Sequence, residues 1–356
     1  MNKLFAQQIL QDIQTVSLQR MQSTDIHLLP FSPAYTPVSF SEEYFQPLSS
    51  LPLVSSPSFP SSSDKVMYFV DGGNAAILQT PDYCLQFLRF ACVGFQNGKR
   101  VFQKKREGYV LAASLQQDSG LVVTLKGYGD FAGVSFPSFA LDDPLLGDLS
   151  LRTKLNRAIE VFRALYEIQF AHELSSAVFS SDSLLVFDRA LLPESVYEQH
   201  AFASLYGSAF EKNIIVSGLN KTTALLCNTG ESVVSHLASF DKKGSWLYFP
   251  VFSTHDLKHN AVLSFVRLHA RSQHIFRLEI CASFADRLFD VASLLASQST
   301  DGVFLGYPYG LLVADQLARV SNREKESLQT LFFAHTGEER FSVAALNAHG
   351  ILDGKL

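Results

Sequence analysis

Residues 151–178 carry the longest helical pattern in the chain, and this pattern limits the folds that are open to it. Apolar side chains recur there every three or four residues, at positions 155, 159, 162, 165, 166 and 170. This spacing is typical of a helix that buries one face. Apolar runs of strand length precede the helix, and strand and helix patterns alternate after it. The order of elements therefore predicts an α/β fold in which helices flank a mixed sheet.

The chain before residue 65 differs in composition from the rest. Residues 1–22 have apolar side chains at helical spacing, and residues 28–63 are rich in serine and proline. We expect a helix followed by an extended arm, with the globular body beginning near Lys65. The sequence thus divides into an N-terminal segment, residues 1–64, and a domain, residues 65–356.

Within the domain, short apolar runs alternate with turn residues and with longer helical patterns. The segment QNG at 96–98 predicts a hairpin turn between two of the strands. Further helices are expected at 196–212, 283–297 and 309–333. Strands are expected at 65–70, 83–95, 99–115, 119–129, 183–192, 213–220, 246–252, 261–269 and 274–280.

Composition excludes several classes of protein. A formal net charge of −5 and a pI of about 6.1 argue against a generally basic coat for nucleic acid, although they allow a local basic groove. No apolar run reaches the length of a membrane span, and the N-terminus lacks the core of a signal peptide. We therefore expect a cytoplasmic protein that makes no membrane contact. The four cysteines lack metal-binding spacing, which predicts buried, reduced thiols.

Two aspartates each follow a strand-like apolar run: Asp71 in VMYFVDGGNAAIL and Asp188 in SLLVFDRALL. If both strands end at one sheet edge, near the acids of the 151–178 helix, the carboxylates repel one another unless a divalent cation neutralises them. Oxygen ligands suit Mg²⁺ or Mn²⁺, and such an ion can activate water for attack on a phosphate. A structural interpretation stays open, because Asp-Gly and Gly-Asn form turns and buried aspartates cap helices.

Six segments in order resemble those of the NurA family of DNA-repair nucleases. YFVDGGNAAIL resembles the family's opening Asp-Gly motif, and LLVFDRALL resembles its second aspartate strand. The later segments are IIVSGLNKTTAL, IFRLEI, GYPYGLLVADQLARVS and NAHGILD. The resemblance spans roughly residues 65–356.

This resemblance implies an RNase H-like core and Mn²⁺-dependent (or Mg²⁺-dependent) cleavage of DNA. It also implies a homodimer that docks on a HerA-type hexameric translocase and processes DNA ends in double-strand-break repair. Asp71 and Asp188 carry over as metal ligands, together with Glu167 from the helix, for which Glu160 is the alternative. His349 matches the family's C-terminal histidine, as a metal ligand or proton-transfer group.

The chain departs from the family pattern at several positions. Arg189 follows Asp188 where the family usually has glycine, the first motif reads Asp-Gly-Gly-Asn rather than Asp-Gly-Ser, and Gly310 stands where proline is common. Arg189 could crowd or neutralise the metal site. The alternative function is therefore a catalytically inactive subunit that binds DNA or the translocase.

Several residues are candidates for contact with DNA. Lys221 could reach the scissile phosphate, and the aromatic residues Tyr307 and Tyr309 could stack on bases. The basic cluster Lys104, Lys105 and Arg106 could follow the phosphate backbone. Each also has a structural interpretation: a loop lysine, packing of a tyrosine at a helix start, and a solvated strand edge that discourages sheet pairing.

Overall fold

The computed structural model describes residue 11 and residues 25–30, 35–48, 65–117, 120–254 and 260–336. The chain forms two compact units. The first unit contains residues 1–65, 186–192 and 215–309. The second contains residues 66–185, 193–214 and 310–356. Of the expected N-terminal helix, only residue 11 is among the described residues. His349 lies outside them.

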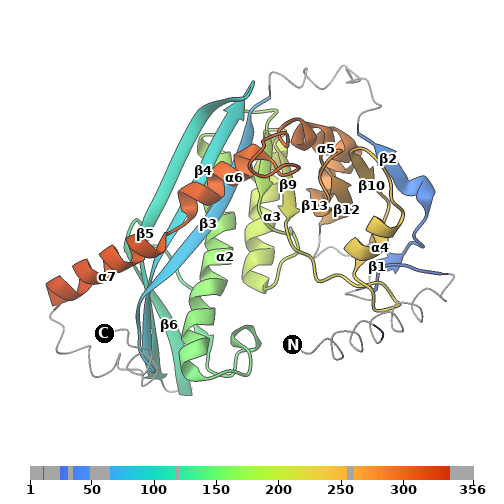
Figure 1. Ribbon diagram of the computed structural model, residues 1–356. Helices are drawn as coiled ribbons and strands as arrows, with labels where there is room; N and C mark the ends of the chain where they lie inside the picture. The colour runs from blue at the N-terminus through green and yellow to red at the C-terminus, as the bar shows by residue number, and fades with distance from the viewer. Residues whose placement is uncertain are drawn as a thin grey trace. The chain divides into compact units, whose positions relative to one another are not determined.

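The second unit is built on a sheet of antiparallel strands (Figure 1). In hydrogen-bonded order these are β3 (Met67–Gln79), β4 (Tyr83–Gln96), β5 (Lys99–Gln117), β6 (Gly120–Gly129) and β7 (Phe139–Ala140). The predicted QNG turn is confirmed, because Asn97 and Gly98 take positive φ angles of 53° and 72°, as a two-residue hairpin loop requires.

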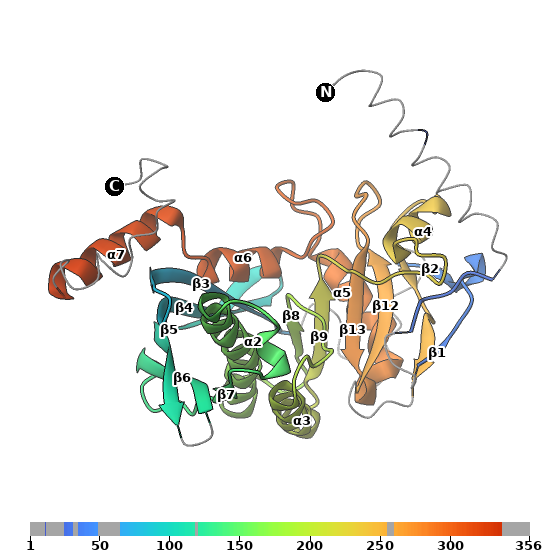
Figure 2. The same cartoon turned by 90° about the horizontal axis from the view of Figure 1, so that it is seen from below.

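Helices cover both faces of β3 and β4 (Figure 2). On one face lies α2 (Leu151–Ala177), with α3 (Val196–Glu211) packed beside it. On the other face lie α6 (Tyr309–Ala318) and α7 (Asn322–Thr336), and α7 packs on an apolar cluster that includes Ile77 and Phe87. Successive side chains of a strand point to opposite faces, so Phe90 packs on Tyr166 of α2 while Phe87 belongs to the α7 cluster.

The first unit holds a second antiparallel series of strands. In hydrogen-bonded order these are β9 (Ile215–Asn220), β13 (Phe276–Cys281), β12 (Ala261–Arg267), β10 (Trp246–Tyr248) and β2 (Phe45–Pro47). A separate pair is formed by β1 (Tyr35–Pro37) and β11 (Phe252–Thr254). The helical segments are η1 (Glu42–Tyr44), α4 (Val233–Ser239), η3 (Ala282–Arg287) and α5 (Leu288–Ser297).

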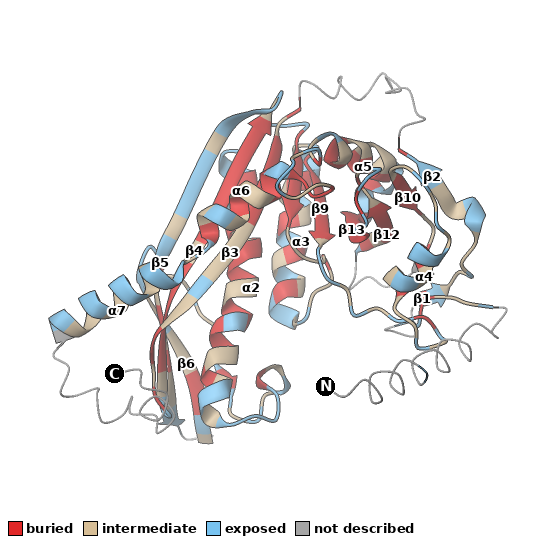
Figure 3. Ribbon diagram, viewed as in Figure 1, coloured by how far each residue is buried: buried red, intermediate tan, exposed pale blue. Residues whose placement is uncertain are grey.

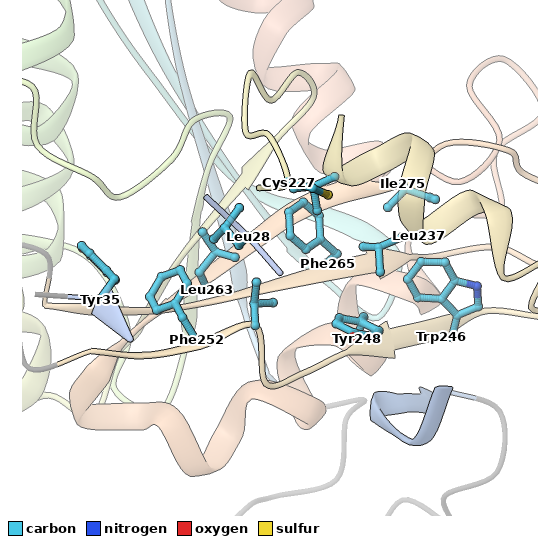
Figure 4. Packing of buried hydrophobic residues seen from close by; sticks show 12 residues of the cluster. Leu28, Tyr35, Cys227, Leu237, Trp246, Tyr248, Phe252, Leu263, Phe265 and Ile275 are labelled. Carbon is cyan, nitrogen blue, oxygen red and sulfur yellow. The ribbon is translucent and has the colours of Figure 1, made fainter. Parts of the chain in front are cut away.

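An aromatic core holds the first unit together, and the predicted arm contributes to it. Tyr248 and Phe265 lie in this core with Leu28 and Tyr35 of the arm (Figure 4). Residues 35–47 are therefore not only an extended arm, because they supply β1, η1 and β2. Burial of their apolar side chains supplies the free energy that orders this serine- and proline-rich stretch.

Buried residues concentrate on the central strands of each unit, above all β4 and β13 (Figure 3). The chain passes from the second unit to the first within β8 (Leu184–Phe187), which is followed directly by Asp188. The expected α/β fold, with an RNase H-like core flanked by helices, is confirmed. Among the described residues, no helix combines the length and the apolar character that crossing a bilayer requires.

Candidate metal centre

Asp71 lies within β3 and not at its end, which corrects the sequence-based expectation. Asp71 pairs with Ala91 of β4, and the strand continues through Gly72, Gly73 and Asn74 to Gln79. The segment Asp-Gly-Gly-Asn forms no turn, and neither glycine has a positive φ. The long partner strand β4 supplies hydrogen bonds along the whole segment, and this pairing outweighs the local preference of these residues for turns.

The two glycines instead allow other groups to approach the strand closely. A Cβ atom on Gly73 would lie 2.4 Å from the carbonyl oxygen of Ala318, at the end of α6. A Cβ atom on Gly72 would lie 2.8 Å from the ring of Phe90. Both distances are shorter than real Cβ contacts, so a larger residue at either position forces its neighbours to move.

Asp315 of α6 is a candidate ligand that the sequence analysis missed. Its carboxylate and that of Asp71 each present an oxygen within 4.8 Å of the other, and both residues are half-buried. The Asp71 carboxylate also accepts a hydrogen bond from the backbone N–H of Gly72 at 2.7 Å. Asp315 lies in the quoted segment GYPYGLLVADQLARVS, but a helical aspartate there has no sequence signal that separates it from a surface residue.

Two glycines allow α6 to pack closely on β3, and this packing places Asp315 near Asp71. Gly310 is the second residue of the helix, and a Cβ atom there would lie 2.1 Å from the Phe69 ring. Gly73 accommodates the other end of the helix at Ala318. The departure from proline at position 310 therefore has a packing explanation, since Phe69 occupies the space that a side chain would need.

Glu167, predicted as the helical ligand, has different neighbours from Asp315. It is 3% exposed, and its carboxylate lies 3.7 Å from Nη1 of Arg163, which also donates to the carbonyl of Gly72 at 2.8 Å. A Cβ atom on Gly72 would point toward Glu167. Because successive residues of a strand point to opposite faces, the side chain of Asp71 shares the α6 face with position 73 and points away from α2. Glu160, the alternative, is exposed on α2 and pairs with Arg157 at 3.5 Å.

Asp188 belongs to the first unit and pairs with Lys221. The Lys221 ammonium lies 2.6 Å from Oδ2 of Asp188, and only 8% of the Asp188 side chain is exposed. Lys221 follows β9 directly and also lies 4.8 Å from the centre of the Tyr307 ring. The lysine predicted to contact a phosphate thus contacts a predicted metal ligand in this structure.

Other residues of the first unit hold the loop that carries Asp188. The backbone N–H of Leu191 donates to Oε2 of Glu279 at 2.5 Å, and Glu279 forms an ion pair with Arg277. Gly218 of β9 leaves room for the carbonyl oxygen of Arg189, which would lie 2.3 Å from a Cβ atom there. The Arg189 side chain donates to the carbonyl of Ala190 through Nε at 3.3 Å.

The two tyrosines proposed to contact DNA have different environments. Tyr307 is 2% exposed, and its ring packs against Phe276 and Phe304. Tyr307 therefore has the packing role that the sequence analysis held open as an alternative. Tyr309 is 40% exposed at the start of α6, so its ring is accessible for stacking.

The basic cluster on β5 lines a cavity in the second unit. Lys104, Lys105 and Arg106 surround a volume of about 400 Å³ together with Asp130 and the segment 132–134. Arg106 donates to the Tyr166 hydroxyl at 2.5 Å and pairs with Glu173 at 2.8 Å. Pairing of β5 with β6 begins only at Gly108, so these basic residues lie on a stretch that pairs with β4 alone within the described residues.

The sheet, its helices and the acidic residues on β3 and α6 define an α/β protein with an RNase H-like core and a candidate metal centre. The sequence model of the NurA domain family matches residues 65–320. Because this match covers most of the chain, the protein belongs to the NurA domain family. No curated protein sequence matches the chain.

Two solved structures are similar to this one. The NurA nuclease from Sulfolobus solfataricus has a TM-score of 0.55 and 9% sequence identity, over 95% of this chain and 98% of that one. The catalytic domain of human Endonuclease V has a TM-score of 0.40 and 10% identity, over 90% of this chain and 98% of that one. The likeness to the Sulfolobus protein establishes a shared fold.

Proposed function

We propose that this protein is a metal-dependent nuclease that hydrolyses the phosphodiester bonds of DNA. Membership of the NurA domain family supports the reaction class. The observation that carries the proposal is the pair of carboxylates Asp71 and Asp315, whose oxygens approach within 4.8 Å on adjoining faces of β3 and α6. Two carboxylates held this close repel each other, and a divalent cation between them offsets the repulsion.

The residues present fit Mn²⁺ or Mg²⁺. Carboxylate oxygens are the ligands that these hard cations prefer, and two aspartates leave coordination positions open for water and phosphate. When bound, the ion would activate a water molecule and stabilise the charge that develops on the phosphate. We propose Asp71, Asp315 and Asp188 as ligands, with Glu167 and His349 as further candidates on the basis of the family resemblance.

The remaining residues would bind the DNA. Lys104, Lys105 and Arg106 line a cavity on an otherwise acidic protein, and cations in such a place bind phosphates and release counterions. Tyr309 offers an accessible ring for a base. We place Lys221 near the reacting phosphate. A homodimer, a HerA-type translocase as partner and a cytoplasmic role in double-strand-break repair complete the proposal, and these rest on the family resemblance.

Two observations favour a second candidate function, an inactive subunit that binds DNA or the translocase. Lys221 already neutralises Asp188 at 2.6 Å, and Arg189 follows it in place of the usual glycine. A permanent lysine at this carboxylate would keep a metal away. The two functions differ in whether the protein binds a divalent cation and cleaves DNA.

Cleavage of labelled single- and double-stranded DNA, with Mn²⁺, Mg²⁺ or EDTA, tests the proposal. We expect cleavage with a metal and none with EDTA. We expect Asp71→Asn and Asp315→Asn each to reduce the rate by about a hundredfold or more, because loss even of a group that only supports a metal ligand commonly costs about 10- to 100-fold. Asp241→Asn is the matched control, because this exposed aspartate pairs with Lys243 on the surface. Metal binding measured in parallel separates the two functions, since the inactive subunit would bind DNA but no Mn²⁺.

A further inference from the structure

The ion pair between Lys221 and Asp188 places a cation of the chain at a proposed metal ligand. The Lys221 ammonium lies 2.6 Å from Oδ2 of Asp188 and 4.8 Å from the centre of the Tyr307 ring. The Asp188 side chain is 8% exposed, whereas that of Lys221 is 39% exposed. The lysine thus reaches from a partly exposed loop to a nearly buried carboxylate, passing over an aromatic face that also attracts cations.

A buried carboxylate needs a cation close to it, because an unpaired buried charge is costly. Lys221 supplies this cation at Asp188 in this structure. A divalent ion at the same carboxylate removes the need and repels the ammonium, since like charges a few ångströms apart in a poorly solvated site interact strongly. Binding of a metal to Asp188 and retention of the Lys221 contact therefore oppose each other.

We propose that Lys221 is a placeholder cation, which holds Asp188 until a metal binds and is then released to a phosphate of the DNA. The inference rests on the proposed function, because it needs Asp188 as a metal ligand. It has two consequences. Lys221 weakens metal binding in the absence of DNA, and metal binding strengthens the interaction with DNA by freeing a positive charge. Linkage makes this coupling reciprocal, so DNA also strengthens metal binding.

The first test is the dissociation constant for Mn²⁺, measured without DNA by titration calorimetry or by the loss of the free-Mn²⁺ electron paramagnetic resonance signal. Lys221→Met removes the charge and keeps much of the side-chain volume. We expect it to bind Mn²⁺ about tenfold more tightly, because no charge-assisted hydrogen bond has to be broken. Lys221→Arg keeps the charge and should bind like the natural protein. The matched control is Lys243→Met, which removes an exposed lysine–aspartate pair elsewhere in the same unit and should leave Mn²⁺ binding unchanged.

The second test is the affinity for a DNA duplex with and without Ca²⁺, an oxygen-seeking ion used here in place of Mn²⁺. The natural protein should bind DNA more tightly with Ca²⁺, and Lys221→Met should lose most of that gain. Unchanged or weaker Mn²⁺ binding by Lys221→Met would overturn the placeholder role, because the lysine would then be neutral or helpful to the metal. Asp188→Asn separates this failure from failure of the proposed function: if that variant binds Mn²⁺ as tightly as the natural protein, Asp188 is not a ligand at all.

Discussion

At the scale of single residues, Glu279 is a charged side chain in a fully buried position of the first unit. It is fully buried in β13, where its carboxylate pairs with Arg277 and accepts the N–H of Leu191. Leu191 lies three residues after Asp188, so this hydrogen bond restrains the loop that carries the proposed ligand. Glu279 is therefore a positioning residue for Asp188 as well as a partner for a buried arginine.

We predict that Glu279→Gln destabilises the protein by about 3–5 kcal/mol, because it removes a negative charge that is paired with a buried guanidinium. Urea denaturation followed by circular dichroism measures this. Glu42→Gln is the matched control, since Glu42 pairs with Lys242 on the surface, where removal of an ion pair costs about 1 kcal/mol or less. A loss no larger than that of the control would contradict the assigned burial of the pair. In the folded variant, weaker Mn²⁺ binding would show that Glu279 positions Asp188.

The individual residues of the site were predictable from the sequence only in part. Asp71 stands out because a carboxylate that interrupts an apolar run needs a reason. Asp315 does not stand out, because its proximity to Asp71 depends on how α6 packs over β3, and this packing depends on Gly73 and Phe69. The face on which Glu167 lies could not be predicted either, since it follows from the register of α2 against the pleat of β3.

At the scale of elements, the helix of residues 151–178 and the hairpin at 96–98 were predicted almost to the residue. Both depend on local patterns, a helical period and a turn dipeptide. Helix α3 and several strands, among them β4, β12 and β13, were also predicted to within two residues of their ends, but other elements were not. The helix expected at 309–333 is two helices, α6 and α7, separated at residues 319–321. The strand expected at 246–252 ends at Tyr248, just before Pro250, a residue that lacks the N–H to continue a ladder.

The close packing of α6 on β3 gives a prediction at the scale of elements. Gly73→Ala places a methyl group 2.4 Å from the Ala318 carbonyl, so α6 has to shift. We expect a loss of about 1–3 kcal/mol in the free energy of unfolding and weaker Mn²⁺ binding, because Asp315 moves with the helix. Thermal unfolding and Mn²⁺ titration measure the two effects. Gly207→Ala, in α3, is the control: its Cβ atom meets nothing within 4 Å, so it should stabilise the helix by up to about 1 kcal/mol. Unchanged Mn²⁺ binding in Gly73→Ala would argue against Asp315 as a ligand.

At the scale of the whole molecule, the chain crosses between the two units five times, at residues 65–66, 185–186, 192–193, 214–215 and 309–310. The division expected at residue 64 was based on a change in composition. The two compact units are instead defined by long-range contacts, which join residues 35–47 to strands some two hundred residues later. Neither unit is one continuous segment, so neither can unfold without altering the chain entropy of the other. We therefore expect the two units to unfold in a single transition.

The four cysteines can be used to test whether the two units unfold together, because each unit contains two of them. Cys84 and Cys92 belong to the second unit, whereas Cys227 and Cys281 belong to the first, and all four are buried, free thiols. Burial raises the pKa of the Cys84 thiol to about 11 and that of Cys227 to about 12. Because the thiolate is the reactive form, none of the four should react with a thiol reagent at pH 8 in the native protein.

In rising urea, the four cysteines should become reactive together, with the same midpoint as the loss of circular dichroism. Mass spectrometry of labelled peptides assigns each site. Four coincident midpoints follow from one cooperative transition, since the thiols are then exposed by the same event. If Cys84 and Cys92 reacted at a lower urea concentration than Cys227 and Cys281, the units would unfold separately in spite of the five crossings. The five chain connections would then be too weak to couple the units, and the stability changes caused by Glu279→Gln and Gly73→Ala would each affect one unit alone.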